Sequence, residues 1–216
     1  MRPERFRRLR SVLSLRQPDL TVLMDRVHKP HNLSAVLRTC DAVGVLEAHA
    51  VVPDGTLRLH RDTSGGTARW VTVHRHPDAT LAIRRLRATG HQVVAAHPSP
   101  DALDFREIDY TVPTAILVGT ELHGVSDEAL AASDRRITIP MMGMVRSLNV
   151  SVATALILYA AQGQRAAAGL YDEPRLSEAR FAETLFEWCH PRRAAKLRER
   201  GESYPPLDPK GGGFRG

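Results

Sequence analysis

The chain has few of the residues and motifs that would place it in a common class of protein. Its two cysteines, Cys40 and Cys189, lie far apart and outside any Cys-x-x-Cys pattern, which argues against a disulfide framework and a zinc site and fits a reducing cytoplasm. No apolar run reaches the roughly 18 residues that a membrane span needs, and no apolar segment follows the basic N-terminus as in a signal peptide. We therefore expect a cytoplasmic protein without a membrane anchor.

Several catalytic and nucleotide-binding motifs are also missing. The sequence has no Gly-x-Gly-x-x-Gly after a strand and no Gly-x4-Gly-Lys-Ser/Thr, so a nucleotide-dependent oxidoreductase or a P-loop enzyme lacks its usual phosphate loop. It has no Gly-x-Ser-x-Gly elbow of a hydrolase. His28 and His31 have a His-x-x-His spacing, but Pro30 lies between them and no carboxylate cluster joins them, so we expect no metal site.

Charge is distributed unevenly along the 216 residues, whose formal net charge is +6. Residues 1–30 carry eight Lys or Arg against three acids, and residues 190–216 carry seven against three. The stretch between them is slightly acidic. A near-neutral centre between two basic ends is typical of an enzyme with arms that bind a polyanion, and the alternative is that basic ends only keep the termini soluble.

Apolar runs alternate with helical patterns through the middle of the chain. The predicted strands are 20–24, 46–52, 70–74, 92–96, 115–119 and 137–139. The predicted helices are 33–43, with Asn32 as its N-cap and Gly44 at its end, and 77–89. A turn at 53–55 and a polar loop at 62–67 lie between them. This alternation predicts an α/β fold, a mostly parallel sheet with helices on both faces.

One stretch, 136–160, combines a strand, a loop and a helix in a way that suggests a ligand site. The short β-branched run at 137–139 ends at Pro140, which cannot donate to a sheet ladder. Ser147 or Asn149 can cap the helix that follows, and this helix is so apolar over 150–161 that we expect it to be buried. Loops between rigid elements are where ligands bind, although a well-packed corner is the plain alternative.

The two ends of the chain differ from this alternating core. Residues 2–16 are predicted to form an amphipathic basic helix, because apolar and arginine positions recur at helical spacing. Such a helix can dock on its own domain and offer arginines to phosphates; lying on a membrane is the weaker alternative, since the apolar face is short. Residues 177–200 are predicted to form one polar helix with Phe181 and Trp188 on its apolar side. The proline and glycine residues beyond 201 predict a disordered tail over 201–216.

Three loops that follow apolar strands carry a resemblance to a known family. Asn32 with Arg38, then Leu-Val-Gly-Thr-Glu-Leu-His-Gly at 117–124, then Ile-Pro-Met at 139–141 with Ser-Leu-Asn-Val-Ser at 147–151, are similar in order and spacing to the three motifs of the SPOUT RNA 2′-O-ribose methyltransferases. The flanking sequences at 16–23, 27–44 and 169–174 resemble the bacterial members that methylate guanosine 18 of tRNA. The tail beyond 200 has no counterpart in this resemblance.

The resemblance implies a fold, a cofactor and an assembly. The C-terminal part of the sheet would be tied in a deep trefoil knot, which pattern analysis cannot predict because connections are unknotted by default. The parts of the chain would be a basic N-terminal helix (1–18), a methyltransferase domain (19–170), a C-terminal helical extension (171–200) and the tail. The enzyme would be a homodimer whose sites are completed across the interface. The residues that match contacts to S-adenosylmethionine, the precursor of S-adenosylhomocysteine, would make these contacts mostly through backbone groups, and they are Ala96, Leu117, Gly119, Ile139, Met141 and Leu148.

The resemblance also assigns catalytic roles. Arg38 would accept the proton of the ribose 2′-hydroxyl, which is chemically awkward because a guanidinium group stays protonated in proteins. Two versions stay open: pairing with an RNA phosphate makes Arg38 basic, or it stays charged and stabilises the developing alkoxide. The other residues assigned are Asn32, which would hold Arg38 and the phosphate, Glu121 near the cofactor, and Ser147 and Asn149, which would order the cofactor loop. No metal is required, because the sulfonium leaves as a neutral thioether.

The basic ends then become candidate contacts to tRNA phosphates. The residues predicted for this role are Arg5, Arg7, Arg8, Arg10, Arg16, His31, Arg165, Arg192 and Arg193. The alternatives are 2′-O-methylation of another RNA site, in ribosomal RNA or at the tRNA wobble position, and a non-catalytic RNA-binding protein of the same fold. The presence of all five catalytic candidates together argues against the last.

Overall fold

The structure is a computed structural model that describes residues 1–53, 69–208 and 213–214. The chain divides into two compact units, residues 18–170 and a second unit formed by 1–17 with 171–216, and each is described by itself. Most of the predicted turn at 53–55, the predicted loop at 62–67 and part of the predicted tail lie outside the described residues. The assignment of 1–18, 19–170, 171–200 and 201–216 as separate parts stays a prediction.

The 18–170 unit is built on a seven-stranded sheet in which every described pair of neighbouring strands is parallel. Its order is β3-β2-β1-β6-β4-β7-β5. The strands are β1 (Leu20–Asp25), β2 (Glu47–Val51), β3 (Thr72–His76), β4 (Gln92–Ala96), β5 (Leu103–Asp104), β6 (Thr114–Val118) and β7 (Arg135–Thr138). The predicted parallel α/β fold is confirmed, and the central strands β1 and β6 are buried along their whole length.

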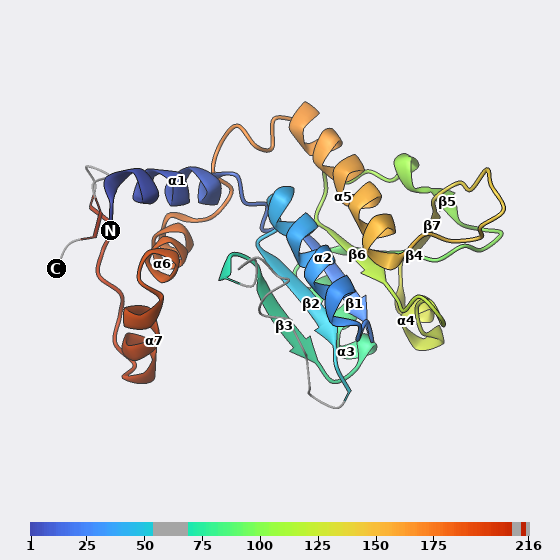
Figure 1. Cartoon of the computed structure of the whole chain (residues 1–216), viewed down its shortest axis with the longest axis horizontal. Helices are drawn as coiled ribbons and strands as arrows, with labels where there is room; N and C mark the ends of the chain where they lie inside the picture. Colours follow the sequence, from blue (N-terminus) through green and yellow to red (C-terminus); the bar gives the residue numbers. More distant parts are fainter. Residues whose placement is uncertain (54–68, 209–212, 215–216) are drawn as a thin grey trace. The chain divides into compact units, whose positions relative to one another are not determined.

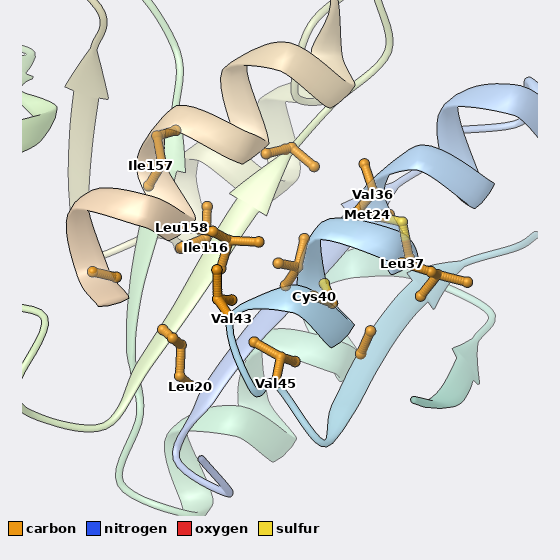
Figure 2. Close-up of a cluster of buried hydrophobic side chains, with 14 of the residues drawn as sticks. Leu20, Met24, Val36, Leu37, Cys40, Val43, Val45, Ile116, Ile157 and Leu158 are labelled. Atoms are coloured by element: carbon orange, nitrogen blue, oxygen red, sulfur yellow. The ribbon is translucent and has the colours of Figure 1, made fainter. Parts of the chain in front are cut away.

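Helices cover both faces of this sheet, as predicted (Figure 1). On one face α2 (Pro30–Ala42) packs beside α5 (Val150–Ala167), and Figure 2 shows Leu37, Cys40, Ile157 and Leu158 meeting the sheet residues in this core. On the other face α3 (Ala79–Ala88) packs beside α4 (Asp127–Ala132). Successive strand residues alternate between the two cores, which fixes which side chains can reach a ligand on either face.

The start of α2 differs from the prediction, which placed Asn32 at its N-cap. The helix begins at Pro30, whose fixed φ and missing N–H suit a first helical position. Asn32 therefore lies inside the first turn, where its side chain is buried and does not cap the helix. This placement leaves its amide available for contacts across the fold.

The expectation that α5 is buried on all sides is wrong for one of its faces. The predicted cap is confirmed, since the Asn149 side chain accepts a 2.9 Å hydrogen bond from the Ser151 amide. Val152, Leu156 and Tyr159, however, are 47%, 43% and 55% exposed and recur at helical spacing. An apolar helix can thus face the core on one side and an uncovered surface on the other.

The boundaries of two strands differ from the predicted ones, because pairing with a neighbouring strand decides where a strand begins and ends. The strand predicted at 70–74 lies at 72–76, because β3 pairs with β2 from Glu47 opposite Thr72 to Val51 opposite His76. The strand predicted at 137–139 begins earlier, at Arg135, in register with β4. The two-residue strand β5 and the six-residue helix α4 had no sequence prediction, because elements this short carry little periodicity.

The second unit is helical and contains α1 (Pro3–Ser14), α6 (Glu178–Cys189) and α7 (Pro191–Glu199). The basic helix predicted at 2–16 is confirmed as α1, which packs on α6. The single helix predicted at 177–200 is wrong, because Pro191 has no amide to continue the first helix and instead starts a second one. None of the helices in the described parts of the chain is long and apolar enough to cross a bilayer.

Part of the predicted disordered tail has defined packing. The Tyr204 ring stacks on Phe186 with ring centroids 4.8 Å apart, and Phe214 contacts the same ring edge-on at 5.0 Å. Tyr204 also donates a 2.9 Å hydrogen bond to Glu187 of α6. The prediction of disorder rested on the proline and glycine content of this segment. It did not take into account that two aromatic side chains can pack on a buried ring.

Candidate active site

A cavity of about 160 Å³ lies at the carboxyl ends of β4, β6 and β7, beside the start of α5. Ligands collect at this edge in open parallel sheets, because the loops that leave the strands there surround a common crevice. The walls are apolar residues of the first core face together with polar residues of the loops at 119–124 and 138–148. We call this the strand-end cavity.

Five of the six residues predicted to contact a cofactor line the strand-end cavity, namely Ala96, Gly119, Ile139, Met141 and Leu148. Leu117 is the exception. Its side chain is fully buried in the second core, on the α3 side of the sheet, while its neighbour Val118 lines the cavity. Successive strand residues point to opposite faces, so the Leu117 side chain cannot face this cavity, and its contact to a cofactor through backbone groups stays a prediction.

Four polar residues from three separate segments meet at the rim of this cavity. Asn149 donates a 3.2 Å hydrogen bond to the side-chain oxygen of Asn32, and the same amide nitrogen contacts the Glu121 carboxylate. Lys29 forms an ion pair with the other oxygen of that carboxylate. The structure therefore brings together three of the five predicted catalytic residues, which are up to 117 positions apart in the chain.

The electrostatics of this rim favour the ionised form of Glu121. The Lys29 ammonium, by donating to the carboxylate, lowers the pKa of Glu121, and the Asn32 amide adds to this shift. Lys29 was not among the sequence candidates, since a single lysine between a histidine and a proline forms no motif. Only the fold brings it to Glu121, 92 residues away.

Gly119 lines the strand-end cavity and also contacts the backbone of Gly124 closely. A Cβ at 119 would overlap the Gly124 carbonyl. Here the loop closes on itself, with Thr120 and Gly124 exchanging two 2.9 Å backbone hydrogen bonds. Gly119 thus shapes the loop that carries Glu121.

Replacing Gly119 with alanine is expected to lower the free energy of unfolding by about 1–3 kcal/mol, because the loop must move to admit the methyl group. Gly163→Ala is the matched control, since a Cβ at this helical glycine meets no atom within 4 Å, and it should be neutral or slightly stabilising. Denaturant unfolding of both variants measures the difference. Equal stabilities would contradict the tight Gly119–Gly124 contact.

The remaining catalytic candidates lie apart from this network. Ser147 is exposed and lines the strand-end cavity. Arg38 and His31 are exposed on α2, and neither is among the described residues that line the cavity. Within one chain, the structure therefore joins Asn32, Glu121 and Asn149 to the cavity without joining Arg38 to it.

The predicted phosphate contacts divide into exposed and buried arginines. Those exposed on the terminal helices, as predicted for a basic arm, are Arg5, Arg7, Arg8, Arg10, Arg192 and Arg193. Arg16 is fully buried, with its guanidinium 5.1 Å from the centre of the Trp188 ring, and Arg165 is fully buried in an ion pair with Asp19. The prediction is wrong for these two side chains, because a charge count cannot distinguish a solvated arginine from one held inside the fold.

The parallel sheet, the cavity at its strand ends and the carboxylate–amide network at the rim together define an α/β protein with a ligand site at the carboxyl ends of its strands. Residues 19–159 match the sequence model of the SpoU rRNA methylase family, and residues 163–212 match the model of the C-terminal region of SpoU rRNA methylases. The chain belongs to the SpoU methylase family. A tRNA (guanosine(18)-2′-O)-methyltransferase of Thermus thermophilus is 59% identical over 184 residues, which are 85% of this chain and 95% of that protein.

Solved structures agree with this membership. The crystal structure of the TrmH/SpoU tRNA modifying enzyme of A. aeolicus has a TM-score of 0.83 at 43% identity and covers 87% of this chain and 96% of its own. The SpoU methyltransferase AviRb of Streptomyces viridochromogenes, crystallised in complex with the cofactor AdoMet, has a TM-score of 0.62 at 28% identity and covers 70% of this chain and 62% of its own.

Proposed function

We propose that this protein transfers a methyl group from S-adenosylmethionine to the ribose 2′-hydroxyl of guanosine 18 in the D-loop of tRNA, in the cytoplasm. The observation that carries the proposal is the strand-end cavity with the Asn32–Glu121–Asn149 network at its rim, in a chain 59% identical to an enzyme named for this reaction. The identity extends over most of both proteins, so the proposal concerns the whole enzyme and not a shared domain alone.

The residues of the strand-end cavity fit S-adenosylmethionine. Its walls include Ala96, Ile137 and Ile139, which can pack on the flat faces of the adenine base, and backbone groups at the strand ends can hydrogen-bond the edge of that base. At the rim, the ionised Glu121 carboxylate is suited to a positively charged sulfonium. When bound, this cofactor supplies an electrophilic methyl group, and such a transfer needs no metal.

The chain's own residues have to hold the ribose in line and assist the loss of its proton. Asn149 caps α5 and contacts both Asn32 and Glu121, so one side chain couples the cofactor loop to the start of α2. Ser147 lies on the same loop, in the cavity wall. Arg38, six residues beyond Asn32, is the group we assign to the 2′-oxygen.

We further propose a homodimer in which each site is completed across the interface. Two observations support this. Arg38 is exposed on α2 and lies outside the described lining of the strand-end cavity, so a single chain leaves the site without its reacting arginine. The apolar stripe of α5, Val152, Leu156 and Tyr159, is exposed, and large exposed apolar patches mark interfaces.

The exposed stripe gives a direct test of the dimer. Leu156→Lys is expected to convert the protein to a monomer in sedimentation and to reduce methyl transfer at least about 100-fold, since a charge in an apolar interface is costly. Val112→Lys is the control, because Val112 is also apolar and 41% exposed but lies in the turn before β6, outside the exposed stripe of α5. A dimeric, active Leu156→Lys protein would contradict an interface on this stripe.

The deep trefoil knot and the RNA-binding arms also belong to this proposal. The parallel sheet with β7 and β5 at its edge, and the likeness to SpoU structures, support a knot in the C-terminal part of the sheet. The exposed arginines of α1 and α7 support contacts to tRNA phosphates. His31, exposed at the start of α2, is a further candidate contact to a tRNA phosphate.

A methyl-transfer assay with labelled S-adenosylmethionine tests the function. An unmodified tRNA transcript should become labelled, and a transcript with 2′-deoxyguanosine at position 18 should not. Label on both would place the methylated atom elsewhere in the tRNA. Label on neither, with cofactor still bound, would favour ribosomal RNA as the substrate or a binding protein without chemistry.

A further inference from the structure

A second cavity, of about 350 Å³, adjoins the strand-end cavity. It lies between the β1–α2 loop and the loop that follows β6, and the two cavities share Thr120, Glu121 and Val150 as walls. The remaining lining residues are Val27, His28, Lys29, Asn32, Leu122 and His123. We call it the Lys29 cavity.

The polar groups of the Lys29 cavity suit an oxyanion. Lys29 and Asn32 both donate to the Glu121 carboxylate, which is the single carboxylate among the described lining residues. Asn149, just outside the lining, donates to the same carboxylate. Three donors from two segments thus converge on one anion, and the imidazoles of His28 and His123 also lie at the cavity wall.

The Lys29–Glu121 pair is not what fastens the two loops together. Asp25 accepts a 2.8 Å hydrogen bond from the Ser126 amide, and Arg26 pairs with Glu128 at 2.6 Å. Arg26 also has a left-handed backbone, with φ of 55°, an uncommon conformation for a residue other than glycine. The loop is therefore held by contacts other than Lys29, whose side chain is 49% exposed and can move without opening the fold.

We propose that Lys29 binds a phosphodiester of the substrate RNA in the Lys29 cavity, next to the ribose that is methylated. When the RNA binds, the Lys29 ammonium leaves its ion pair with Glu121 and pairs with this phosphate. The inference rests on the proposed function, because it takes RNA as the substrate. A phosphate suits this site better than a base edge, since the convergent groups are donors. In the free protein Glu121 keeps the lysine at the cavity rim.

The test compares Lys29→Gln with the wild type in tRNA binding as a function of salt. Losing one phosphate contact should reduce the slope of log Kd against log salt by about 0.9 and weaken tRNA binding about 10-fold at low salt. Lys29→Arg should restore the slope. Arg106→Gln is the matched control, because Arg106 is an exposed cation paired with Asp104 elsewhere on the unit and should leave both quantities unchanged.

A second experiment locates the phosphate. It uses two tRNAs, each with a neutral methylphosphonate on one side of guanosine 18. One of them should bind the wild type as weakly as unmodified tRNA binds Lys29→Gln, and the same replacement should not weaken tRNA binding by Lys29→Gln any further. Affinity for S-adenosylmethionine, measured by calorimetry, should be the same in all variants.

An unchanged salt slope and tRNA affinity in Lys29→Gln would overturn the inference. So would an unchanged slope accompanied by lower stability and weaker cofactor binding, which would make Lys29 a purely structural partner of Glu121. These readouts are independent of methyl transfer: a wild-type protein that binds tRNA without methylating it would refute the proposed function and leave the slope comparison valid.

Discussion

Replacing Arg165 with methionine is expected to lower the free energy of unfolding by about 3–5 kcal/mol, because the change removes one partner of a buried ion pair. The guanidinium is fully buried near the C-terminal end of α5. It donates to the Asp19 carboxylate at 2.7 Å and to the backbone oxygens of Tyr110, Val112 and Asp19 at 2.8, 3.0 and 3.2 Å. One side chain thus joins the chain entering β1 and the turn before β6 to α5.

The size of the effect follows from what methionine leaves behind. Methionine fills much of the same volume, so the loss comes from acceptors without donors and not from an empty space. Each buried acceptor left unsatisfied costs about 1–3 kcal/mol, and the carboxylate costs more. Gln164 partly limits the damage, because it independently bonds Ile108 and Tyr110 in the same turn, with distances of 2.9 and 2.8 Å.

Denaturant unfolding at a fixed protein concentration measures this prediction. Arg106→Met removes an exposed arginine whose pair with Asp104 is solvated, so the free energy of unfolding should change little. Adding Asp19→Asn to Arg165→Met should recover part of the lost stability, since the uncompensated charge is then gone. A loss below about 1 kcal/mol in Arg165→Met would show that water or another donor replaces the guanidinium.

Arg165 also illustrates what the sequence can and cannot predict. Its position on an apolar helix was visible, but its partner Asp19 lies 146 residues earlier, and no local pattern connects them. Asn149 is the opposite case, because capping depends on residues one turn away and could be predicted. Local chemistry is therefore predictable from sequence, and long-range electrostatic partners are not.

The candidate site likewise has residues that could be predicted from the sequence and residues that could not. The cofactor residues at the strand ends were assigned by the resemblance to the methyltransferase family, and the fold places five of the six at one cavity. The Leu117 side chain lies in the other core, because successive residues of a strand alternate between the faces of the sheet. No sequence pattern indicates the Lys29 cavity, because its walls come from loops around 28 and 121 that only the parallel pairing of β1 with β6 brings together.

Replacing Arg38 with alanine is expected to lower kcat for methylation of tRNA by about 100- to 10,000-fold, the usual effect of losing a group that assists proton removal or stabilises a developing oxyanion. Stability and affinity for S-adenosylmethionine should change little, because Arg38 is exposed on α2 and is not part of the described lining of the strand-end cavity. Arg84→Ala, which removes another exposed helical arginine, should leave kcat unchanged.

Arg38→Lys then separates the two roles that arginine can have. If Arg38 accepts the proton, lysine deprotonates at lower pH than arginine, with an ordinary pKa of about 10.4, so the rising limb of the pH–rate profile should move to lower pH. If Arg38 acts as a charge, lysine keeps that charge but not the planar fork, so kcat should fall without a shift of the profile. Full activity in Arg38→Lys with an unshifted profile would contradict both roles, and full activity in Arg38→Ala would remove Arg38 from the chemistry altogether.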